Sequence, residues 1–370
     1  MKTAYKRKVL VYLFGSLGDT IVAIPALRAV RRHFGNAELV LLHNTPQNQV
    51  VSASDVIPTN LIDRSIDYTS SAGQVSNYFR LWMKIHTEKF DAAVYLVISE
   101  RPARSVRRDR LFFRSCGIRE LFGFNAFSMD QLYPIDHDGR PGTVDHEAVR
   151  KLQRLEADGI QRSPSEDLRQ PLFEASSIEQ EEMSRWLAPL RQKPDRPLLA
   201  MAPGCKTPAN FWPTENFVSI AKQLAAEHLC EIVIVGGPAE KQLGDDLVAN
   251  LGTGINAAGK FAVRGSAALL SLCNLYFGLD TGTTHLAAAV GTPVVALFHE
   301  RDNPGQWFPL GNGHTIFQHD VACAGCRSQE CPVAGHPCMK GISVEPVLEE
   351  LRKKLRSKEK NASDLRILKV

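Results

Sequence analysis

The chain has 370 residues, a length that favours two domains over one. Hydrophobic residues make up 44% and charged residues 23%, a balance typical of globular proteins with a sizeable core. The net charge of +4 is too small to indicate nucleic-acid binding. No apolar run approaches the roughly 18 residues that a membrane span needs. The basic and then apolar N-terminus is interrupted at Gly15, so it predicts a first strand rather than a signal peptide, and we expect a cytoplasmic protein.

In the first half, apolar runs that predict strands alternate with periodic segments that predict helices. The predicted strands are 8–13, 37–45 and 90–98, and the predicted helices are 20–34, 72–89, 145–160 and 176–190. This alternation predicts a parallel sheet with helices on both faces. An arginine-rich stretch follows the third strand.

A second alternation begins after a proline-containing linker, 191–197. Its predicted strands are 197–202, 230–235, 275–279 and 293–299, and its predicted helices are 214–229, 239–252, 261–274 and 284–291. The chain is therefore predicted to be an α/β protein with two Rossmann-like domains, 1–190 and 195–350, and a basic C-terminal tail, 351–370. Two such domains facing each other form a cleft where the carboxyl ends of their strands meet.

A polar loop in the second half joins a predicted strand to a small-residue helix. Its sequence, DTGTTH, combines free helix N-terminal amides, three threonine hydroxyls and a glycine that lets a ligand approach the backbone. This pattern predicts a diphosphate site, and ordinary helix capping is the alternative. The residues assigned to the site are Asp280, Thr281, Gly282, Thr283, Thr284 and His285.

Two further loops are expected on the same rim. In the loop 201–213, Lys206 and Thr207 can reach an anion, whereas Phe211 and Trp212 can pack against a base or in the core. After the strand that ends in VGG, Glu240 can accept a hydrogen bond from a ribose hydroxyl. A glycine pair after a strand is also plain turn chemistry.

The first predicted strand leads into the loop GSLGD, which places Asp19 at the mouth of a helix. The carboxylate puts a negative charge where a phosphate would be expected, and a carboxylate can serve as a general base without a partner. Helix capping by Asp19 is the alternative, because Asp is among the best capping residues.

The arginine-rich stretch offers six cations: Arg101, Arg104, Arg107, Arg108, Arg110 and Arg114. If the stretch is helical, Arg104 and Arg108 share a face, as do Arg107 and Arg114. Such a patch suits a phosphorylated or acidic acceptor or an anionic membrane surface. A solvated basic face is the alternative.

Four cysteines lie close together in the pattern C-x2-C-x4-C-x6-C: Cys323, Cys326, Cys331 and Cys338. Four thiolates at this spacing predict a structural zinc site without an open catalytic position. Reduced cysteines in a loop, or disulfides, are the alternatives, and a reducing cytoplasm disfavours disulfides.

Two of these segments, GSLGDTIVAIPALRAVRR and DTGTTHLAAAVGTPVVALF, resemble glycosyltransferase family 9, which includes the ADP-heptose:lipopolysaccharide heptosyltransferases. Other segments fit the resemblance as well: PG…WP at 203–213, VGGPAE at 235, HEAVRKLQRLEADGI at 146 and CMKGISVEPVLEEL at 338. The resemblance runs over residues 8–350, and the order and spacing of the segments make it specific.

The resemblance implies a GT-B fold, with the acceptor on the N-terminal domain and the nucleotide-sugar on the C-terminal one. It implies an inverting reaction that needs no metal, with Asp19 as general base. For the acceptor site we assign Gly15, Gly18, Arg104 and Arg107. The donor residues are Lys206, Thr207, Asn210 and Glu240 together with the DTGTTH loop.

The expected donor is ADP-heptose and the expected acceptor is lipopolysaccharide core, with peripheral contact at the inner membrane and no cofactor. Asn210 stands where the family often has a lysine, which leaves another nucleotide-sugar as an alternative.

Three other classes of protein remain as alternatives. A GT-B epimerase would pair further carboxylates and histidines across the cleft. A dinucleotide-dependent oxidoreductase is disfavoured because neither half has GxGxxG after its first strand. A nucleotide-binding module without activity would keep the DTGTTH loop but would have no use for Asp19 as a base.

Overall fold

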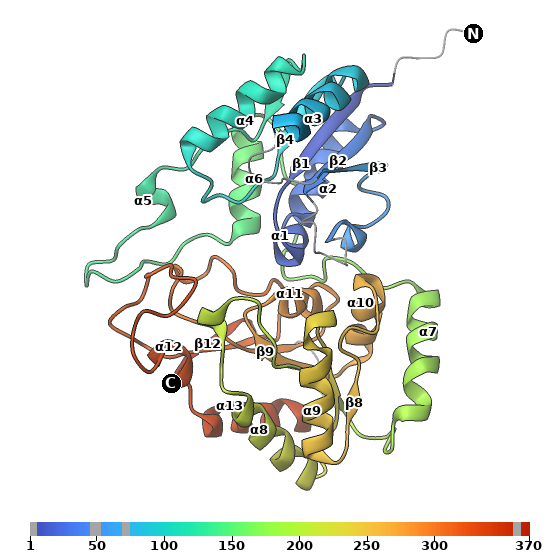
Figure 1. Cartoon of the computed structure of the whole chain (residues 1–370), viewed down its shortest axis with the longest axis vertical. Helices are drawn as coiled ribbons and strands as arrows, with labels where there is room; N and C mark the ends of the chain where they lie inside the picture. The colour runs from blue at the N-terminus through green and yellow to red at the C-terminus, as the bar shows by residue number, and fades with distance from the viewer. Residues whose placement is uncertain (1–5, 45–52, 69–74, 358–363) are drawn as a thin grey trace. The chain divides into compact units, whose positions relative to one another are not determined.

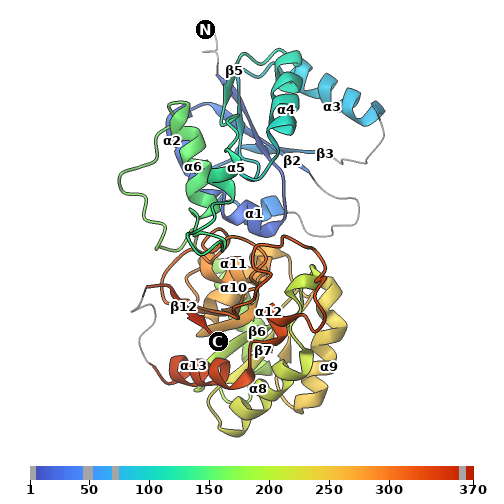
Figure 2. The same cartoon turned by 90° about the vertical axis from the view of Figure 1, so that its left-hand side faces the viewer.

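The computed structural model describes residues 6–44, 53–68, 75–357 and 364–370. The chain divides into two compact units, which Figures 1 and 2 show in two views. Unit 1 comprises residues 1–134 and 144–167, and unit 2 comprises residues 135–143 and 168–370. Among the described residues, no helix combines the length and apolar character that crossing a membrane requires.

Unit 1 is built on a parallel five-stranded sheet in the order β3-β2-β1-β4-β5. Its strands are β1 (Lys8–Leu13), β2 (Glu38–Asn44), β3 (Arg64–Tyr68), β4 (Ala92–Tyr95) and β5 (Glu120–Phe122). Its helices are α1 (Leu17–Ile21), α2 (Ile24–Phe34), α3 (Val75–Glu88), α4 (Ala103–Ser115), α5 (Met129–Leu132) and α6 (Glu147–Ala157), with a 3-10 turn, η1 (Ala53–Val56). Helices α2 and α6 cover one face of the sheet, and α3 and α4 cover the other (Figure 2).

Unit 2 is built on a parallel seven-stranded sheet in the order β12-β11-β10-β9-β6-β7-β8. Its strands are β6 (Leu198–Ala202), β7 (Glu231–Ile234), β8 (Ile255–Asn256), β9 (Leu275–Leu279), β10 (Val294–Leu297), β11 (Thr315–Gln318) and β12 (Arg366–Lys369). Its helices are α7 (Ser177–Leu187), α8 (Thr214–Ala226), α9 (Lys241–Leu251), α10 (Val263–Leu272), α11 (Gly282–Ala289), α12 (Pro337–Lys340) and α13 (Val344–Arg356). Three 3-10 turns complete the unit: η2 (Ala188–Leu190), η3 (Pro208–Asn210) and η4 (Pro238–Glu240).

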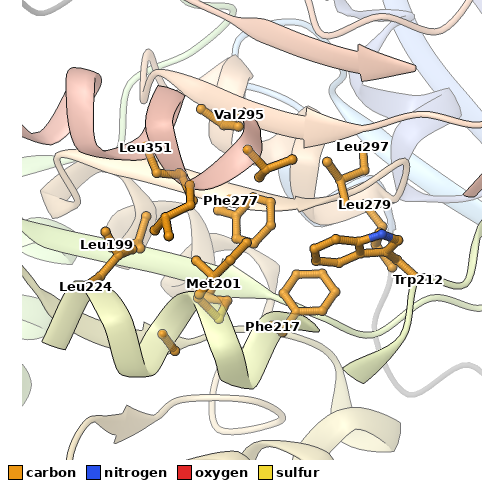
Figure 3. Close-up of a cluster of buried hydrophobic side chains, with 14 of the residues drawn as sticks. Leu199, Met201, Trp212, Phe217, Leu224, Phe277, Leu279, Val295, Leu297 and Leu351 are labelled. Atoms are coloured by element: carbon orange, nitrogen blue, oxygen red, sulfur yellow. The ribbon is translucent and has the colours of Figure 1, made fainter. Parts of the chain in front are cut away.

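Aliphatic and aromatic side chains together fill the core of unit 2 (Figure 3). Trp212 packs edge-on against Phe217 with ring centroids 5.1 Å apart, and Phe217 lies 5.0 Å from Phe277. The indole N–H of the buried Trp212 donates to the carbonyl of Ile342, so the one polar atom of the ring is satisfied. Trp212 is therefore a core residue and does not stack on a nucleotide base, whereas Phe211 is exposed.

The predicted domain boundaries differ from the two units. Residues 168–190 belong to unit 2 because α7 packs on α10, with the Trp186 ring edge-on to Phe261 at 4.8 Å. Residues 135–143 also belong to unit 2, and the side-chain amide of Asn303 donates to the carbonyl of Gly142. The predicted tail, 351–370, instead completes α13 and supplies β12, which pairs in parallel with β11.

The first predicted helix is two helices, because α1 ends at Ile21 and α2 begins at Ile24. Pro25 occupies the first turn of α2, where its missing N–H costs no hydrogen bond. The break leaves α1 as a short helix that holds the GSLGD loop. The part of the predicted helix 72–89 before Val75 lies outside the described residues, as does Thr45 of the second predicted strand.

Candidate functional site

The sheet order of unit 2 brings the three predicted donor loops to one edge. Strands β9, β6 and β7 are neighbours and run parallel, so the loops that follow them leave the sheet at the same end. The side-chain amide of Asn210 in the β6 loop donates to the carbonyl of Asp280 after β9, at 2.8 Å. Asn210 is buried and holds two of the loops together.

Threonine hydroxyls form a short hydrogen-bonded chain at the start of α11. The hydroxyls of Thr281 and Thr283 lie 2.8 Å apart, and the hydroxyl of Thr283 lies 2.9 Å from that of Tyr276. Thr281 and Thr283 are both partly exposed. Together with the first amides of this eight-residue helix, they present donors at its positive end.

The next two residues of the predicted site face the interior. Thr284 is fully buried; its hydroxyl donates to the carbonyl of Leu279 and lies 3.0 Å from the phenol oxygen of Tyr276. His285 is also buried, with its ring centroid 6.5 Å from that of Trp307. The side chains of Thr284 and His285 therefore pack in the interior and support the loop, whereas the hydroxyls of Thr281 and Thr283 are partly exposed.

The side chains of His299 and Asp280 are in close contact beside the same loop. Nε2 of His299 lies 2.9 Å from Oδ2 of Asp280, and Nδ1 of His299 accepts the backbone N–H of Arg301, so Nε2 carries the proton. Burial raises the pKa of Asp280, but contact with His299 and the charges of His285 and Arg301 lower it more. The net pKa lies below the ordinary value, and Asp280 is a carboxylate that fixes the loop.

Glu240 lies over three glycines that come from two loops. A Cβ on Gly204, in the β6 loop, would lie 2.3 Å from Cγ of Glu240. A Cβ on Gly236 would lie 2.9 Å from its Cβ, and one on Gly237 would lie 3.1 Å from its Oε2. The absence of side chains at these positions creates the space in which Glu240 packs. Lys206 is exposed and Thr207 is partly exposed in the neighbouring β6 loop.

In unit 1, Asp19 belongs to a capping box at the start of α1. Its Oδ2 accepts the backbone N–H of Ser16 at 2.6 Å and the hydroxyl of Ser16 at 2.8 Å. Ser16 is the N-cap residue and Asp19 stands three positions later, so Asp19 contributes to capping without being the N-cap itself. Among the described residues, Oδ1 of Asp19 has no hydrogen-bond partner, and the side chain is half-buried.

Gly15 gives Asp19 its position. Its φ of +148° is one that residues with side chains rarely adopt, and a Cβ there would lie 2.4 Å from Cγ of Asp19. Gly18 is buried within α1, where its carbonyl accepts the backbone N–H of Val22. The two glycines predicted as acceptor residues therefore shape the loop that carries the carboxylate.

A cavity of about 540 Å³ opens in unit 1 beside Phe14, the residue before this loop. It lies at the carboxyl ends of β1, β2 and β3, between α3 and α4, and its lining is mainly aromatic and apolar. The charged residues in the lining are Arg101, Arg108 and Asp109. Asp109 accepts hydrogen bonds from both guanidinium groups and from the hydroxyl of Tyr95.

The arginine-rich stretch forms α4, as the sequence allowed. Arg104 and Arg107, the two predicted acceptor residues, are exposed on its outer surface, whereas Arg101 and Arg108 line the cavity. The sequence did not separate these two pairs. The signal was the single acidic residue between Arg101 and Arg114, Asp109, because a buried carboxylate needs cations or hydrogen-bond donors beside it.

Helix α6 places four charged side chains in the interior of unit 1: Glu147, Arg150, Lys151 and Arg154. Lys151 lies 3.1 Å from Glu147 and donates to the carbonyl of Leu96 at 2.8 Å. Glu147 accepts the backbone N–H and the hydroxyl of Ser99, and Arg154 donates to the carbonyls of Val97 and Ser99. These contacts hold the segment after β4 in place. Sequence periodicity missed them because it treats charged residues as surface residues.

The cysteine cluster lines a small pocket of unit 2 together with His336. All four are free thiols, and burial raises the pKa of Cys338. Within the described residues, no group of three or more His, Cys, Asp or Glu side chains is arranged so that it could hold a metal ion. The geometry therefore does not support the predicted structural zinc at Cys323, Cys326, Cys331 and Cys338.

Comparison with known proteins gives consistent relatives. The family model described as "Glycosyltransferase family 9 (heptosyltransferase)" matches residues 147–336. A lipooligosaccharide heptosyltransferase 2 of Campylobacter jejuni is 23% identical over 359 residues, which cover 94% of this chain and 98% of the relative. The lipopolysaccharide heptosyltransferase 2 of Escherichia coli K12 is 28% identical over 200 residues, 52% of this chain and 57% of the relative.

Two solved structures share the fold over nearly the whole chain. A glycosyl transferase family 9 structure from Veillonella parvula has a TM-score of 0.72 and 20% identity, covering 96% of this chain and 98% of that one. The E. coli ADP-heptose lipopolysaccharide heptosyltransferase II has a TM-score of 0.67 and 20% identity, covering 94% and 98%. At this level of identity, the likeness concerns the fold.

Proposed function

The chain belongs to glycosyltransferase family 9, and on this premise we propose that it transfers heptose from ADP-heptose to a lipopolysaccharide core, with inversion and without a metal. It is a glycosyltransferase of GT-B fold, with a parallel sheet in each of its two units. One observation carries the donor part of the proposal. Loops from three adjacent strands present helix amides, partly exposed threonine hydroxyls and Glu240 at one edge of unit 2.

This edge of unit 2 is proposed to bind the leaving diphosphate. As the bond from the anomeric carbon to the diphosphate breaks, negative charge develops on the ADP oxygens. The amides of α11 and the hydroxyls of Thr281 and Thr283 stabilise that charge, and Gly282 allows close approach. Thr284, His285 and Asp280 keep the loop in shape from the interior.

Other parts of the same edge suit the rest of the nucleotide. Glu240 accepts from the ribose hydroxyls, and Lys206 supplies a mobile cation for the phosphates. Thr207 adds a hydroxyl, and Asn210 acts by fixing the loop through the Asp280 carbonyl.

Asp19 is the proposed general base. Its carboxylate takes the proton from an acceptor hydroxyl as that oxygen forms its bond to the anomeric carbon from the face opposite the leaving ADP. The two bonds from Ser16 to Oδ2 fix the carboxylate and leave Oδ1 for the acceptor. Capping and catalysis are compatible here, because they use different oxygen atoms of one side chain.

The acceptor is proposed to contact unit 1. The Gly15 and Gly18 loop lies beside the cavity that Arg101 and Arg108 line, and Arg104 and Arg107 extend the positive charge along α4. Guanidinium groups bind the carboxylates and phosphates of an anionic glycan well. The enzyme is then expected at the cytoplasmic side of the inner membrane, where such glycolipids are extended.

A second candidate function is a glycosyltransferase of the same fold that uses a different nucleotide-sugar donor. Asn210 stands where the family often has a lysine, and its amide is engaged with Asp280. We propose that this difference from the family pattern goes with a different nucleotide-sugar.

The test is nucleotide release from a panel of ADP-heptose, UDP-glucose and GDP-mannose, with and without deacylated lipopolysaccharide core. ADP release that requires both ADP-heptose and the core supports the proposal, and UDP or GDP release supports the second candidate. Release that does not need an acceptor, or no release from any donor, overturns it. NMR of the product tests inversion, and activity that EDTA abolishes and Mg²⁺ restores would contradict metal independence.

A further inference from the structure

Helices α3 and α4 concentrate the positive charge of the chain. They hold seven basic residues against two acidic ones, a net charge of +5, whereas the whole chain has +4. Both acidic residues are already paired, Glu88 with Arg64 and Asp109 with Arg101 and Arg108. The basic residues are Arg80, Lys84, Arg104, Arg107, Arg108, Arg110 and Arg114. The outer surface of the two helices therefore carries cations without acidic neighbours on the same helices.

An apolar side chain lies among the arginines of α4. Leu111 is 63% exposed, and it follows Arg107 by four positions and precedes Arg114 by three, so the three share one helix face. Val106 and Phe113 are buried on the opposite face, where they pack in the core of unit 1. Leu111 thus gains no contact with that core.

Helix α3 continues the apolar surface. Phe79 is 60% exposed and stacks on Trp82 with ring centroids 6.0 Å apart, and Met83, one turn later, is exposed as well. The indole N–H of Trp82 donates to the hydroxyl of Ser115 at the end of α4, which joins the two helices side by side. The exposed apolar residues of α3 therefore lie on the side that adjoins α4.

We propose that this surface, the α3–α4 face, docks on an anionic lipid bilayer. We define the face by its apolar residues Phe79, Met83 and Leu111 and its cations Arg80, Lys84, Arg104, Arg107, Arg110 and Arg114. Cations near a negatively charged leaflet gain attraction, while aromatic and aliphatic side chains enter the headgroup region. The charge pattern selects this occupant over a second copy, because a symmetric dimer would oppose the same arginines to each other.

This inference deepens the proposed function, on which its biological meaning rests. A glycolipid acceptor is anchored in a bilayer, and the cavity of unit 1 opens between the same two helices. Docking through their outer surface brings the acceptor-binding unit to the membrane that displays the acceptor. The docking itself needs neither donor nor transfer.

The test measures binding to vesicles of phosphatidylcholine with 30% phosphatidylglycerol and to vesicles of phosphatidylcholine alone, by co-sedimentation without nucleotide-sugar. We expect binding to the anionic vesicles that weakens with added NaCl, and little binding to the neutral ones. The variant Arg110→Gln/Arg114→Gln should bind about 25-fold more weakly, about fivefold for each charge. The variant Phe79→Ser/Leu111→Ser should bind about tenfold more weakly, because less apolar surface enters the interface.

Matched controls come from exposed positions of unit 2. Arg185→Gln/Lys193→Gln removes two exposed cations, and Ile178→Ser removes an aliphatic side chain that is 68% exposed. Both controls should bind like the wild type. Absence of binding to anionic vesicles overturns the proposal, and so does binding that the two α3–α4 variants leave unchanged or that the controls weaken equally.

Transfer to the water-soluble deacylated core separates this inference from the proposed function. The α3–α4 variants should keep that transfer, because none of the four residues lines the cavity or belongs to the donor loops or the Asp19 loop. If the wild type binds vesicles but does not transfer sugar to the soluble core, only the proposed function is contradicted. Intact transfer without vesicle binding counts against docking alone.

Discussion

The carboxylate of Asp19 occupies the space that a side chain at Gly15 would fill. A Cβ on Gly15 would lie 2.4 Å from Cγ and 2.5 Å from Oδ2 of Asp19, and the φ of Gly15 is +148°. The loop therefore has a glycine at residue 15 because of the acid four residues later. The position of the proposed base therefore depends on the absence of a side chain at residue 15.

Gly15→Ala should displace the base. The new methyl group overlaps the carboxylate and strains the backbone, so we expect kcat to fall at least about tenfold while the Kd for ADP stays the same. Single-turnover kinetics and calorimetric titration with ADP measure the two quantities. Gly35→Ala is the control, since Gly35 also has a positive φ of +51° but nothing within 4 Å of the added Cβ. If kcat fell equally in Gly15→Ala and Gly35→Ala, backbone strain rather than displacement of Asp19 would explain the loss.

Asp19→Asn should remove the base and keep the loop. The amide oxygen can still accept from Ser16, so the capping box survives in part while proton abstraction is lost. We expect kcat to fall by about 10²- to 10⁴-fold with an unchanged thermal midpoint. Asp130→Asn, in the first turn of another short helix of unit 1, should keep full activity. An Asp19→Asn enzyme of wild-type rate would assign Asp19 to capping alone.

Thr281 and Thr284 should separate ligand binding from stability. Thr281 is partly exposed, so Thr281→Ala should weaken ADP binding about fivefold to tenfold at unchanged stability. Thr284 is buried and bonded to Tyr276 and Leu279, so Thr284→Ala should lower the free energy of unfolding by about 1–3 kcal/mol. Calorimetric titration and urea unfolding distinguish the two effects. If Thr284→Ala weakened ADP binding and Thr281→Ala only lowered stability, the proposed position of ADP at the exposed side of α11 would be wrong.

Removing one partner of the buried pair in α6 should be among the most destabilising changes in unit 1. Lys151→Met leaves the carboxylate of Glu147 buried with its cation gone, at a cost of about 3–5 kcal/mol. Lys222→Met, at an exposed position of α8, should change stability by about 0.5 kcal/mol or less. Urea unfolding at pH 7 measures both variants. A Lys151→Met protein of wild-type stability would mean that Glu147 is protonated when folded.

Acid should destabilise unit 2 through His314. Its Nδ1 accepts the N–H of Val294 and its Nε2 donates to the carbonyl of Leu310, and burial lowers its pKa from 6.5 to about 4. Between these values the unfolded chain binds a proton that the folded chain excludes, so stability falls as pH falls from about 6.5 towards 4. From pH 7 to pH 5 the expected loss is about 2 kcal/mol.

His314→Gln should lack this part of the pH dependence, whereas His137→Gln, at an exposed position, should keep it. Urea unfolding at both pH values gives the comparison. A His314→Gln protein with the wild-type pH dependence would assign the acid sensitivity to other groups.

Much of the fold followed from apolar runs. Strand β1 matches its prediction residue for residue, because it is buried almost throughout and lies at the centre of the sheet. The edge strands β3 and β12 were not predicted. Their sequences, RSIDY and RILK, combine charged residues with few apolar ones, and their pairing depends on a neighbouring strand that local periodicity does not include.

The candidate site was likewise predicted only in part. The positions of the donor loops at one edge could be predicted, since parallel neighbours end on the same side of a sheet. The sequence could not show that Thr284 turns inward while Thr283 stays partly exposed, because both are polar residues in the first turn of one helix. It also could not show that Arg101 and Arg108 share a buried carboxylate, since that depends on how α4 packs on the sheet.

The hydrogen bonds from α6 to the segment after β4 affect how unit 1 binds a ligand. The carbonyls of Leu96, Val97 and Ser99 accept hydrogen bonds from two cations of α6 that lie 55 to 57 residues further along the chain. The segment leads directly to Arg101 at the cavity. Its conformational entropy is thus given up when the protein folds, so an incoming acceptor meets a pre-organised wall and loses little affinity to ordering it.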